Sequence, residues 1–145
     1  MPEPDTRRQQ AMMALPAEAC RVRTVRHFVA ALLRSWGVIE SDRDTACLIV
    51  SELAGNAAQH GGAEMTVCVS LSAESLCIDV VDTGSASRVP HPHCGDLDEE
   101  HGRGLGIVDC LADWIDVVAE PDRWRSRAGL RVSRAVPAQR ILPAA

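Results

Sequence analysis

The most conspicuous absence from this chain is lysine, because all 15 basic residues are arginines. Every positive side chain is therefore a planar guanidinium, suited to bidentate contacts with carboxylates or phosphates. A Walker-type phosphate loop needs a lysine after its glycines, so that class of site is excluded. The 20 acidic residues give a formal net charge of −5, which argues against general attraction to nucleic acid. Arginines cluster over residues 123–134, a pattern that fits either a protein partner or a polyanion.

The sequence also has no long hydrophobic run and no secretion signal. Its apolar stretches fall far short of the roughly 20 residues that a membrane span requires. Residues 1–5 contain no basic segment leading into a hydrophobic one. We therefore expect a cytoplasmic protein without membrane contact. Six cysteines lie mostly in apolar periodic segments without paired short spacings, which favours buried thiols over disulfides: Cys20, Cys47, Cys68, Cys77, Cys94 and Cys110.

The length of 145 residues fits one domain, and 46% hydrophobic residues suffice for a buried core. Residues 1–16 are polar and contain prolines, so we expect a loose N-terminal leader there. The periodic segments occupy residues 17–136, which we assign to the folded domain. Residues 137–145 are expected to form a C-terminal tail.

Two helices are predicted in the first half of the chain. Apolar residues recur at helical spacing over residues 17–36, and Gly37 is a suitable stop. A second helix is predicted from about Arg43 to His60, because capping residues precede it and two glycines follow it.

One face of the second predicted helix changes character along its length. Leu48, Glu52, Asn56 and His60 recur every four residues, so their side chains stack on nearly one face. We interpret this stripe as facing the core, and buried polar groups need partners such as a ligand, a metal ion or water. The alternative is a set of polar positions on an exposed helix surface.

A β-hairpin is predicted from the strict alternation of apolar and polar residues over 65–71 and 76–80. By the same parity Asp82 points toward the core, whereas Asp79 points to the other face. An inward carboxylate at the strand end is a good acceptor for the exocyclic amine of a purine. The alternative is a turn residue, because Asp-Thr-Gly is a common turn composition.

A segment without periodicity covers residues 83–101 and contains prolines, histidines and acidic residues. It is longer than an ordinary connection, which favours a lid or binding loop. Its histidines and Cys94 match no zinc-site spacing that we can justify, so a polar loop is favoured over a metal site.

The glycine-rich turn Gly102-Arg103-Gly104-Leu105-Gly106 leads into an amphipathic helix. Such a turn offers backbone N–H groups and the positive end of the helix dipole to a phosphate, although a flexible hinge has the same composition. Strands are predicted over residues 115–119 and 130–136, with a turn region between them. The order of elements predicts an α+β fold, a two-layer sandwich of helices on one mixed, mainly antiparallel sheet.

Three segments together resemble the N, G1 and G2 boxes of the GHKL ATP-binding fold of gyrase B, Hsp90 and histidine kinases. They are Glu52…Asn56…His60-Gly61, Asp82-x-Gly84 and the glycine-rich turn over residues 102–106. The length and the segment Val50-Ser51-Glu52-Leu53 make the chain most similar to anti-sigma factor serine kinases of the SpoIIAB and RsbW type, numerous in actinobacteria. The resemblance covers roughly residues 17–136.

The resemblance implies ATP and Mg²⁺ as cofactors and a role for each matching residue. Glu52 is implied as the general base toward a serine hydroxyl, and Asn56 as the Mg²⁺ ligand. Asp82, with Gly84 beside it, is implied as the adenine anchor. The other nucleotide-binding positions are His60, Gly102, Arg103, Gly104, Leu105 and Gly106.

The implied function is that of an anti-sigma factor with serine-protein kinase activity. It would phosphorylate a STAS-type anti-anti-sigma protein and sequester a sigma factor, as a homodimer without direct nucleic-acid contact. Two positions depart from the family pattern: Ala86 replaces a glycine, and Gly129-Leu130-Arg131 lacks the expected threonine. They keep open a non-catalytic partner-binding module with a degenerate nucleotide site. A hydrolase or detached sensor-kinase domain is disfavoured, because His27 is followed by Phe28 rather than an acidic residue.

Overall fold

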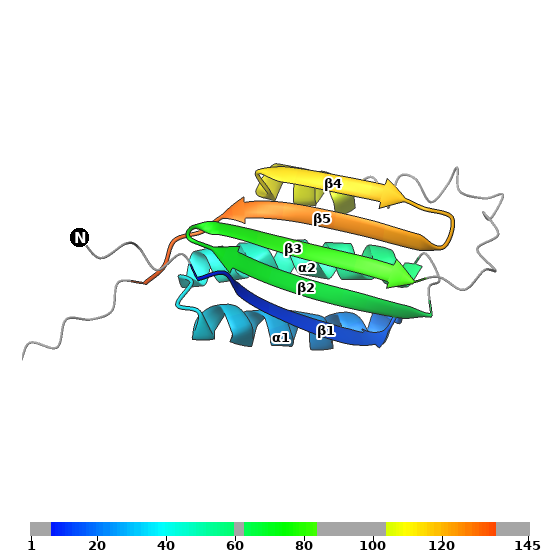
Figure 1. Ribbon diagram of the computed structural model, residues 1–145, viewed down its shortest axis with the longest axis horizontal. Coiled ribbons are helices and arrows are strands. Elements are labelled where there is room, and N and C mark those ends of the chain that lie inside the picture. Colours follow the sequence, from blue (N-terminus) through cyan, green and yellow to red (C-terminus); the bar gives the residue numbers. More distant parts are fainter. Residues whose placement is uncertain (1–6, 60–62, 84–103, 136–145) are drawn as a thin grey trace, which may run out of the picture.

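The computed structural model describes residues 7–59, 63–83 and 104–135 of the chain. Five strands form one sheet, and the helices cover a single face of it (Figure 1). The strands are β1 (Gln9–Pro16), β2 (Glu64–Ser72), β3 (Ser75–Thr83), β4 (Trp114–Ala119) and β5 (Arg123–Arg131). The helical elements are the 3-10 turn η1 (Ala19–Arg21), α1 (Val22–Ser35), α2 (Glu40–Gln59) and a helix over residues 104–111.

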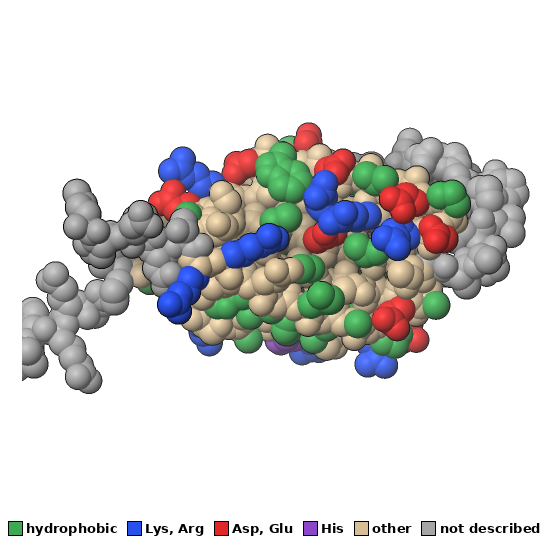
Figure 2. All heavy atoms as spheres, in the orientation of Figure 1, with side chains coloured by type: hydrophobic (Ala, Val, Ile, Leu, Met, Phe, Trp, Pro, Cys, Tyr) green, Lys and Arg blue, Asp and Glu red, His purple; other side chains and the backbone are tan. Residues whose placement is uncertain are grey.

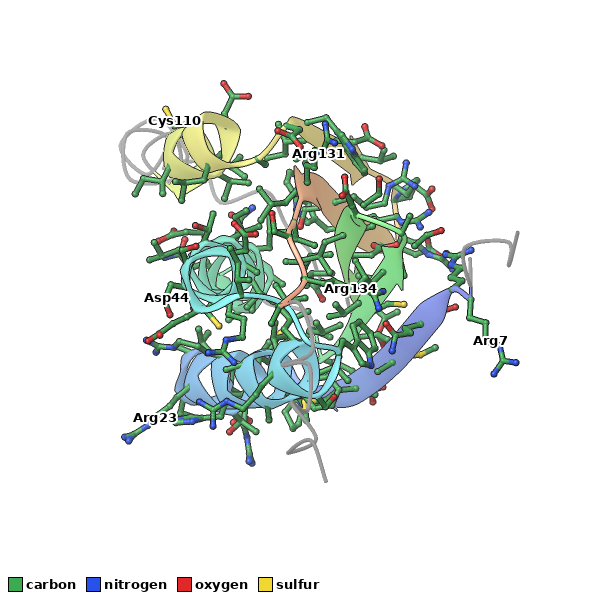
Figure 3. The ribbon with its side chains drawn as sticks, turned by 90° about the vertical axis from the view of Figure 1, so that its left-hand side faces the viewer. Arg7, Arg23, Asp44, Cys110, Arg131 and Arg134 are labelled. Carbon is green, nitrogen blue, oxygen red and sulfur yellow. The ribbon has the colours of Figure 1, made fainter. Side chains whose placement is uncertain are left out.

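The sheet has the strand order β1-β2-β3-β5-β4, and each of these pairings is antiparallel. In the β2–β3 hairpin, Val67 lies opposite Val80 on the helix-facing side, while Cys68 lies opposite Asp79 on the outer side. Viewed from one end, the helix over 104–111, α2 and α1 lie side by side in a single layer (Figure 3). The predicted α+β class, with helices layered on one sheet, is confirmed.

The hydrophobic core lies between this helical layer and the sheet. Side chains from α1 and α2 meet alternating residues of β2 and β3, as expected for two amphipathic layers. Each of the following is 1% exposed or less: Val25, Val29, Leu33, Ile49, Val50, Leu53, Met65, Val67, Val69, Leu71, Leu76, Ile78 and Val80. Among the described residues, the helices are too short or too polar for any of them to span a membrane.

Two strands lie where the sequence analysis did not predict them. Residues 9–16 were expected in a loose leader, but they form β1, which pairs with β2 along its whole length. This strand lies at the sheet edge and its inward residues are only half-buried, so its apolar alternation is weak. The last strand is β5, whereas the sequence predicted a strand over 130–136. The prediction missed β5 because every second residue of it is an arginine or Gly129 on the outer face, which is not typical of a strand.

Candidate functional site

Helix α2 carries the polar stripe that the sequence analysis singled out. Leu48 is 53% exposed, Glu52 is half-buried and Asn56 is 8% exposed. The prediction that the whole stripe faces the core is therefore wrong at Leu48. Residues four apart advance by roughly 40° around a helix, so a four-residue stripe winds from the surface at its start to the interior at its end.

The start of the helix over residues 104–111 lies directly against Glu52. A Cβ added to Gly104 would be 2.6 Å from Oε2 of Glu52 and 3.7 Å from its Cδ, whereas ordinary contacts are 3.4–4 Å. No other residue type fits here without moving the carboxylate. The glycine thus lets an acidic side chain lie at the positive end of a helix, where negative charge is favoured. Glu52 and Asn56 are one helical turn apart, so an amide and a carboxylate lie beside this helix start.

Asp82 lies at the end of β3 and is completely buried, which confirms the predicted inward parity. Its neighbours across the sheet are Met65 on β2 and Trp124 on β5. The carboxylate is thus set in largely apolar surroundings, where hydrogen bonds are strong. The end of β3 and the C-terminal end of α2 lie at the same end of the molecule (Figure 1). Backbone N–H of Ala63 donates to the carbonyl of Thr83 at 3.3 Å and ties the two connections together.

Ser126 is a further polar residue of this layer that sequence reasoning missed. It lies on the helix-facing side of β5, opposite Val80, and is completely buried. Because Trp124 is opposite Asp82, Ser126 is a diagonal neighbour of that carboxylate. Its Oγ finds no hydrogen-bond partner within the described part of the chain. The signal for it was the alternation of arginines with Trp124, Ser126 and Ala128, which marks the inward positions of β5.

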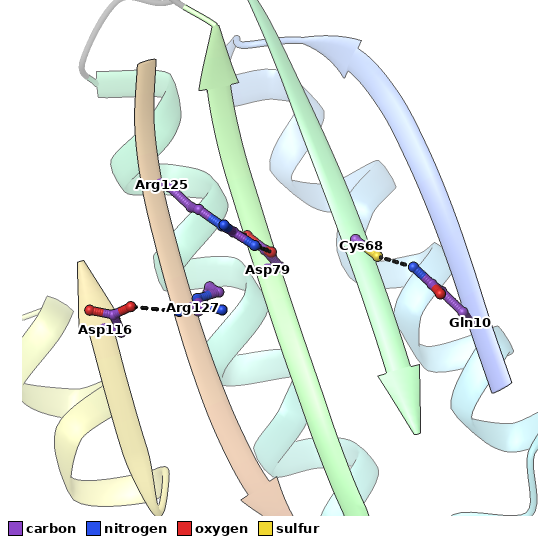
Figure 4. Close-up of polar contacts among 6 residues, drawn as sticks. All are labelled: Gln10, Cys68, Asp79, Asp116, Arg125 and Arg127. Atoms are coloured by element: carbon purple, nitrogen blue, oxygen red, sulfur yellow. Dashed lines mark hydrogen bonds and ion pairs between the residues drawn. The ribbon is translucent and has the colours of Figure 1, made fainter. Parts of the chain in front are cut away.

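The arginines of β5 lie on the opposite, outer face of the sheet (Figure 2). Arg125 donates from Nε to both carboxylate oxygens of Asp79 at 3.1 Å, and this hydrogen bond is the main cause of its raised pKa. Arg127 donates to Asp116 at 2.8 Å (Figure 4). The guanidinium carbon of Arg127 also lies 6.0 Å from the centroid of the Trp114 ring. These pairs neutralise Arg125 and Arg127, so the middle of the arginine cluster is a cross-strand ladder rather than a free basic patch.

Several predicted site residues lie outside the described residues: His60, Gly84, Gly102 and Arg103, together with Ala86 and the histidine-containing segment. Leu105 is half-buried and packs against the core, and a Cβ at Gly106 would meet open space. Within the described ranges, no three histidine, cysteine or acidic side chains cluster as a metal site. The structure therefore joins Glu52 to Gly104 and buries Asn56 and Asp82 between the helices and the sheet.

The fold is thus a single antiparallel sheet covered on one face by helices, with an acid and an amide on one helix beside the glycine start of another. Residues 15–127 match the family model described as histidine kinase-like ATPase domain. The chain belongs to this family, and the predicted GHKL-type assignment is confirmed.

Two solved structures share this fold. The RsbU and RsbW domains of Rv1364c from Mycobacterium tuberculosis match with a TM-score of 0.68 and 21% identity, covering 88% of this chain and 33% of that chain. The SiaB–SiaC complex from Pseudomonas aeruginosa matches with a TM-score of 0.59 and 13% identity, covering 83% of this chain and 88% of that chain. The present chain thus corresponds to about a third of the Rv1364c chain. No curated protein sequence matches it.

Proposed function

We propose that this protein is a kinase that transfers the γ-phosphate of ATP to a serine hydroxyl of a partner protein. The observation that carries the proposal is the contact of the Glu52 carboxylate with Gly104, one helical turn from the buried amide of Asn56. A potential base and a phosphate-binding helix start are therefore adjacent. Family membership supports the use of ATP.

The residues present fit ATP and Mg²⁺. The amide oxygen of Asn56 is a hard oxygen donor of the kind that Mg²⁺ prefers. The missing side chain at Gly104 keeps the helix start open on the side of Glu52. Asp82 accepts from the amine of the base, and the hydroxyl of Ser126 lies beside it as a second polar group. The bound nucleotide supplies the phosphoryl group, and the metal ion neutralises its charge.

Glu52 acts as the general base in this proposal. Its carboxylate accepts the proton of the substrate hydroxyl while the serine oxygen bonds to the γ-phosphorus. The bond from that phosphorus to the β–γ bridging oxygen breaks in the same transfer, and ADP leaves with the bonding electrons. Asn56, one helical turn from Glu52, would hold the metal ion and so would help to orient the phosphate groups relative to the base. His60, Gly84, Gly102, Arg103, Leu105 and Gly106 are proposed to complete the nucleotide site, as the family resemblance implies.

The proposed protein substrate is a STAS-type anti-anti-sigma protein, and the second proposed partner is a sigma factor. Both structural neighbours support a role in protein assemblies, since SiaB was solved in complex with SiaC and the RsbW domain together with an RsbU domain. We propose a cytoplasmic homodimer that regulates transcription by holding the sigma factor.

A non-catalytic partner-binding module is the second candidate function. It is favoured by Arg131, which stands where the family's Gly-x-Thr pattern has a threonine and instead pairs with Glu74 at 2.8 Å. Such a module would bind STAS or sigma partners without phosphorylating them.

One assay separates the two functions. The purified chain is incubated with labelled ATP, Mg²⁺ and STAS-domain proteins of the same genome. Serine labelling that disappears in Glu52→Ala supports the kinase. In Asn56→Ala, Mg²⁺-dependent ATP binding is expected to be lost, and unchanged Mg²⁺-ATP affinity would contradict its assignment. No nucleotide binding at millimolar ATP, with partner binding retained, identifies the module.

A further inference from the structure

An apolar groove continues the candidate site beyond Glu52. It has a volume of about 600 Å³ and is lined by Leu48 of α2 and by residues of the helix over 104–111: Gly106, Ile107, Cys110 and Leu111. Leu48 and Ile107 are 53% and 45% exposed, which is high for large aliphatic side chains that face each other across a concavity. None of the lining residues is charged or carries a hydrogen-bonding side chain other than the thiol of Cys110.

The groove and Glu52 lie along the same pair of helices, α2 and the helix over 104–111, which run in opposite directions. Glu52 contacts Gly104 at the start of the second helix, and Leu48, one turn earlier on α2, shares the groove with Ile107, one turn later on that helix. Four residues of α-helix rise by about 6 Å. Leu48, and with it the groove, therefore lies about 6 Å from Glu52 along the helix axis, on the side away from the buried Asn56.

This geometry restricts what a phosphorylated segment can present to the protein. An extended chain rises by about 3.3 Å per residue and its side chains alternate, so the residue two positions from an acceptor serine lies about 6.6 Å away on the same side. That distance matches the separation of Leu48 from Glu52 along α2. For an extended segment that runs along α2, a serine hydroxyl at Glu52 brings the side chain two positions away over Leu48 and Ile107.

We propose that the groove is a specificity site, which binds an apolar side chain two residues from the serine that is phosphorylated. The inference rests on the proposed kinase function and adds a requirement for the substrate. Its occupant is apolar because a charged or amide side chain in this groove would lose water without gaining a hydrogen bond. Gly106 is suited to a close approach, since a Cβ there would project into open space.

The test uses the full chain and STAS-domain proteins of the same genome as substrates. Leu48→Gln and Ile107→Gln remove apolar surface while keeping side chains of similar length, and Met12→Gln, 65% exposed on β1, is the matched control. We expect the KM for the protein substrate to rise roughly tenfold in both groove variants, from the loss of one partly buried aliphatic contact. The kcat at saturating substrate, the Mg²⁺-ATP affinity and all parameters of the control remain unchanged.

A second substitution in the substrate locates the contact. Changing the apolar residue two positions from the serine to Gln raises KM to a similar extent, and combining it with Leu48→Gln adds no further increase. Additive increases in KM for the combined substitutions, or an unchanged KM in Leu48→Gln, overturn the groove proposal. The kinase proposal is not affected by these results as long as the wild-type chain labels the serine.

The remaining outcomes separate the two proposals. If no STAS protein is labelled, the proposed kinase activity is refuted. The affinity of the same proteins for the wild type and for Leu48→Gln, measured by calorimetry, then tests the groove proposal. A tenfold weaker affinity in Leu48→Gln supports docking there, whereas unchanged or absent binding overturns it. A change of oligomeric state in Leu48→Gln, measured by sedimentation, overturns it too, because the groove is then an interface between two copies.

Discussion

Replacing Gly104 by alanine separates the position of the Glu52 carboxylate from the stability of the fold. The new Cβ would lie 2.6 Å from Oε2 of Glu52, and ordinary contact begins at 3.4 Å, so the oxygen has to retreat by about 0.8 Å. The atom that moves is the end of a flexible side chain, so the fold accommodates the change at little cost. The position of a proposed catalytic base, however, shifts by nearly one ångström.

A displacement of this size is expected to lower kcat on the order of 10²-fold, as found for misplaced catalytic groups. This corresponds to about 2.7 kcal/mol in the activation free energy. The free energy of unfolding is expected to stay equal or to rise by up to about 1 kcal/mol, because alanine is the better helix former. Transfer of labelled phosphate gives kcat, and urea unfolding followed by circular dichroism gives the stability.

Gly55→Ala is the matched control, because it makes the same replacement on α2 where a Cβ meets nothing within 4 Å. This variant is expected to gain helix stability without a change in kcat. Full activity in Gly104→Ala would refute the reasoning, since it would mean that the carboxylate position does not matter for the reaction. A loss of activity accompanied by a loss of stability would place the defect in folding instead.

Three further predictions follow from buried groups. Ser126→Ala removes a buried hydroxyl that has no partner within residues 7–59, 63–83 and 104–135, so the free energy of unfolding is expected to stay equal or to rise by about 1 kcal/mol. Titration with ATP is expected to show weaker binding, and an unchanged affinity would exclude Ser126 from the site. Burial, aided by Asp44 and Asp79 respectively, raises the pKa of the Cys47 and Cys77 thiols above their usual 9.0. The two thiols therefore contribute fully to stability below about pH 9.0, and this contribution declines as the pH rises through their folded-state pKa. In a variant with alanine at both positions, the urea midpoint is expected to fall less at alkaline pH than in the wild type. Gly129→Ala forces a Cβ into the Trp114 ring and is expected to lower the free energy of unfolding by about 1–3 kcal/mol. An unchanged urea midpoint would argue against this packing of Trp114 on Gly129.

The sequence predicts those parts of the fold in which the spacing of apolar residues follows the burial of their side chains. The β2–β3 hairpin lies in the centre of the sheet, so its inward positions are fully buried and uniformly apolar up to Asp82. The direction of that carboxylate followed from parity alone. β1 was missed because an edge strand needs only half-buried alternation, and β5 because its outward arginines depend on Asp79 and Asp116 of other strands.

The candidate site was only partly predictable, because its decisive contact joins residues distant in sequence. Spacing along α2 indicated that Glu52 and Asn56 lie one turn apart, but no periodicity indicates that Gly104 lies against Glu52. The winding of the four-residue stripe was also missed. Its exposed start at Leu48 became informative only when Ile107 was found on the facing helix.

The polar groups on the two faces of the sheet are expected to differ in their effect on ligand binding, and this difference can be measured. Cross-strand ion pairs on the outer face are partly exposed and each contributes about 0–1 kcal/mol. On the inner face, the hydroxyl of Ser126 is buried without a hydrogen-bond partner among the residues that the structure describes, and such a group lowers the stability of the ligand-free fold. A ligand that hydrogen-bonds to this group binds the folded state alone, so it stabilises the protein by about 2.7 kcal/mol at 100 times its Kd. The gain in unfolding free energy with Mg²⁺-ATP should therefore persist in Arg125→Gln, which changes only the outer face, and shrink in Ser126→Ala.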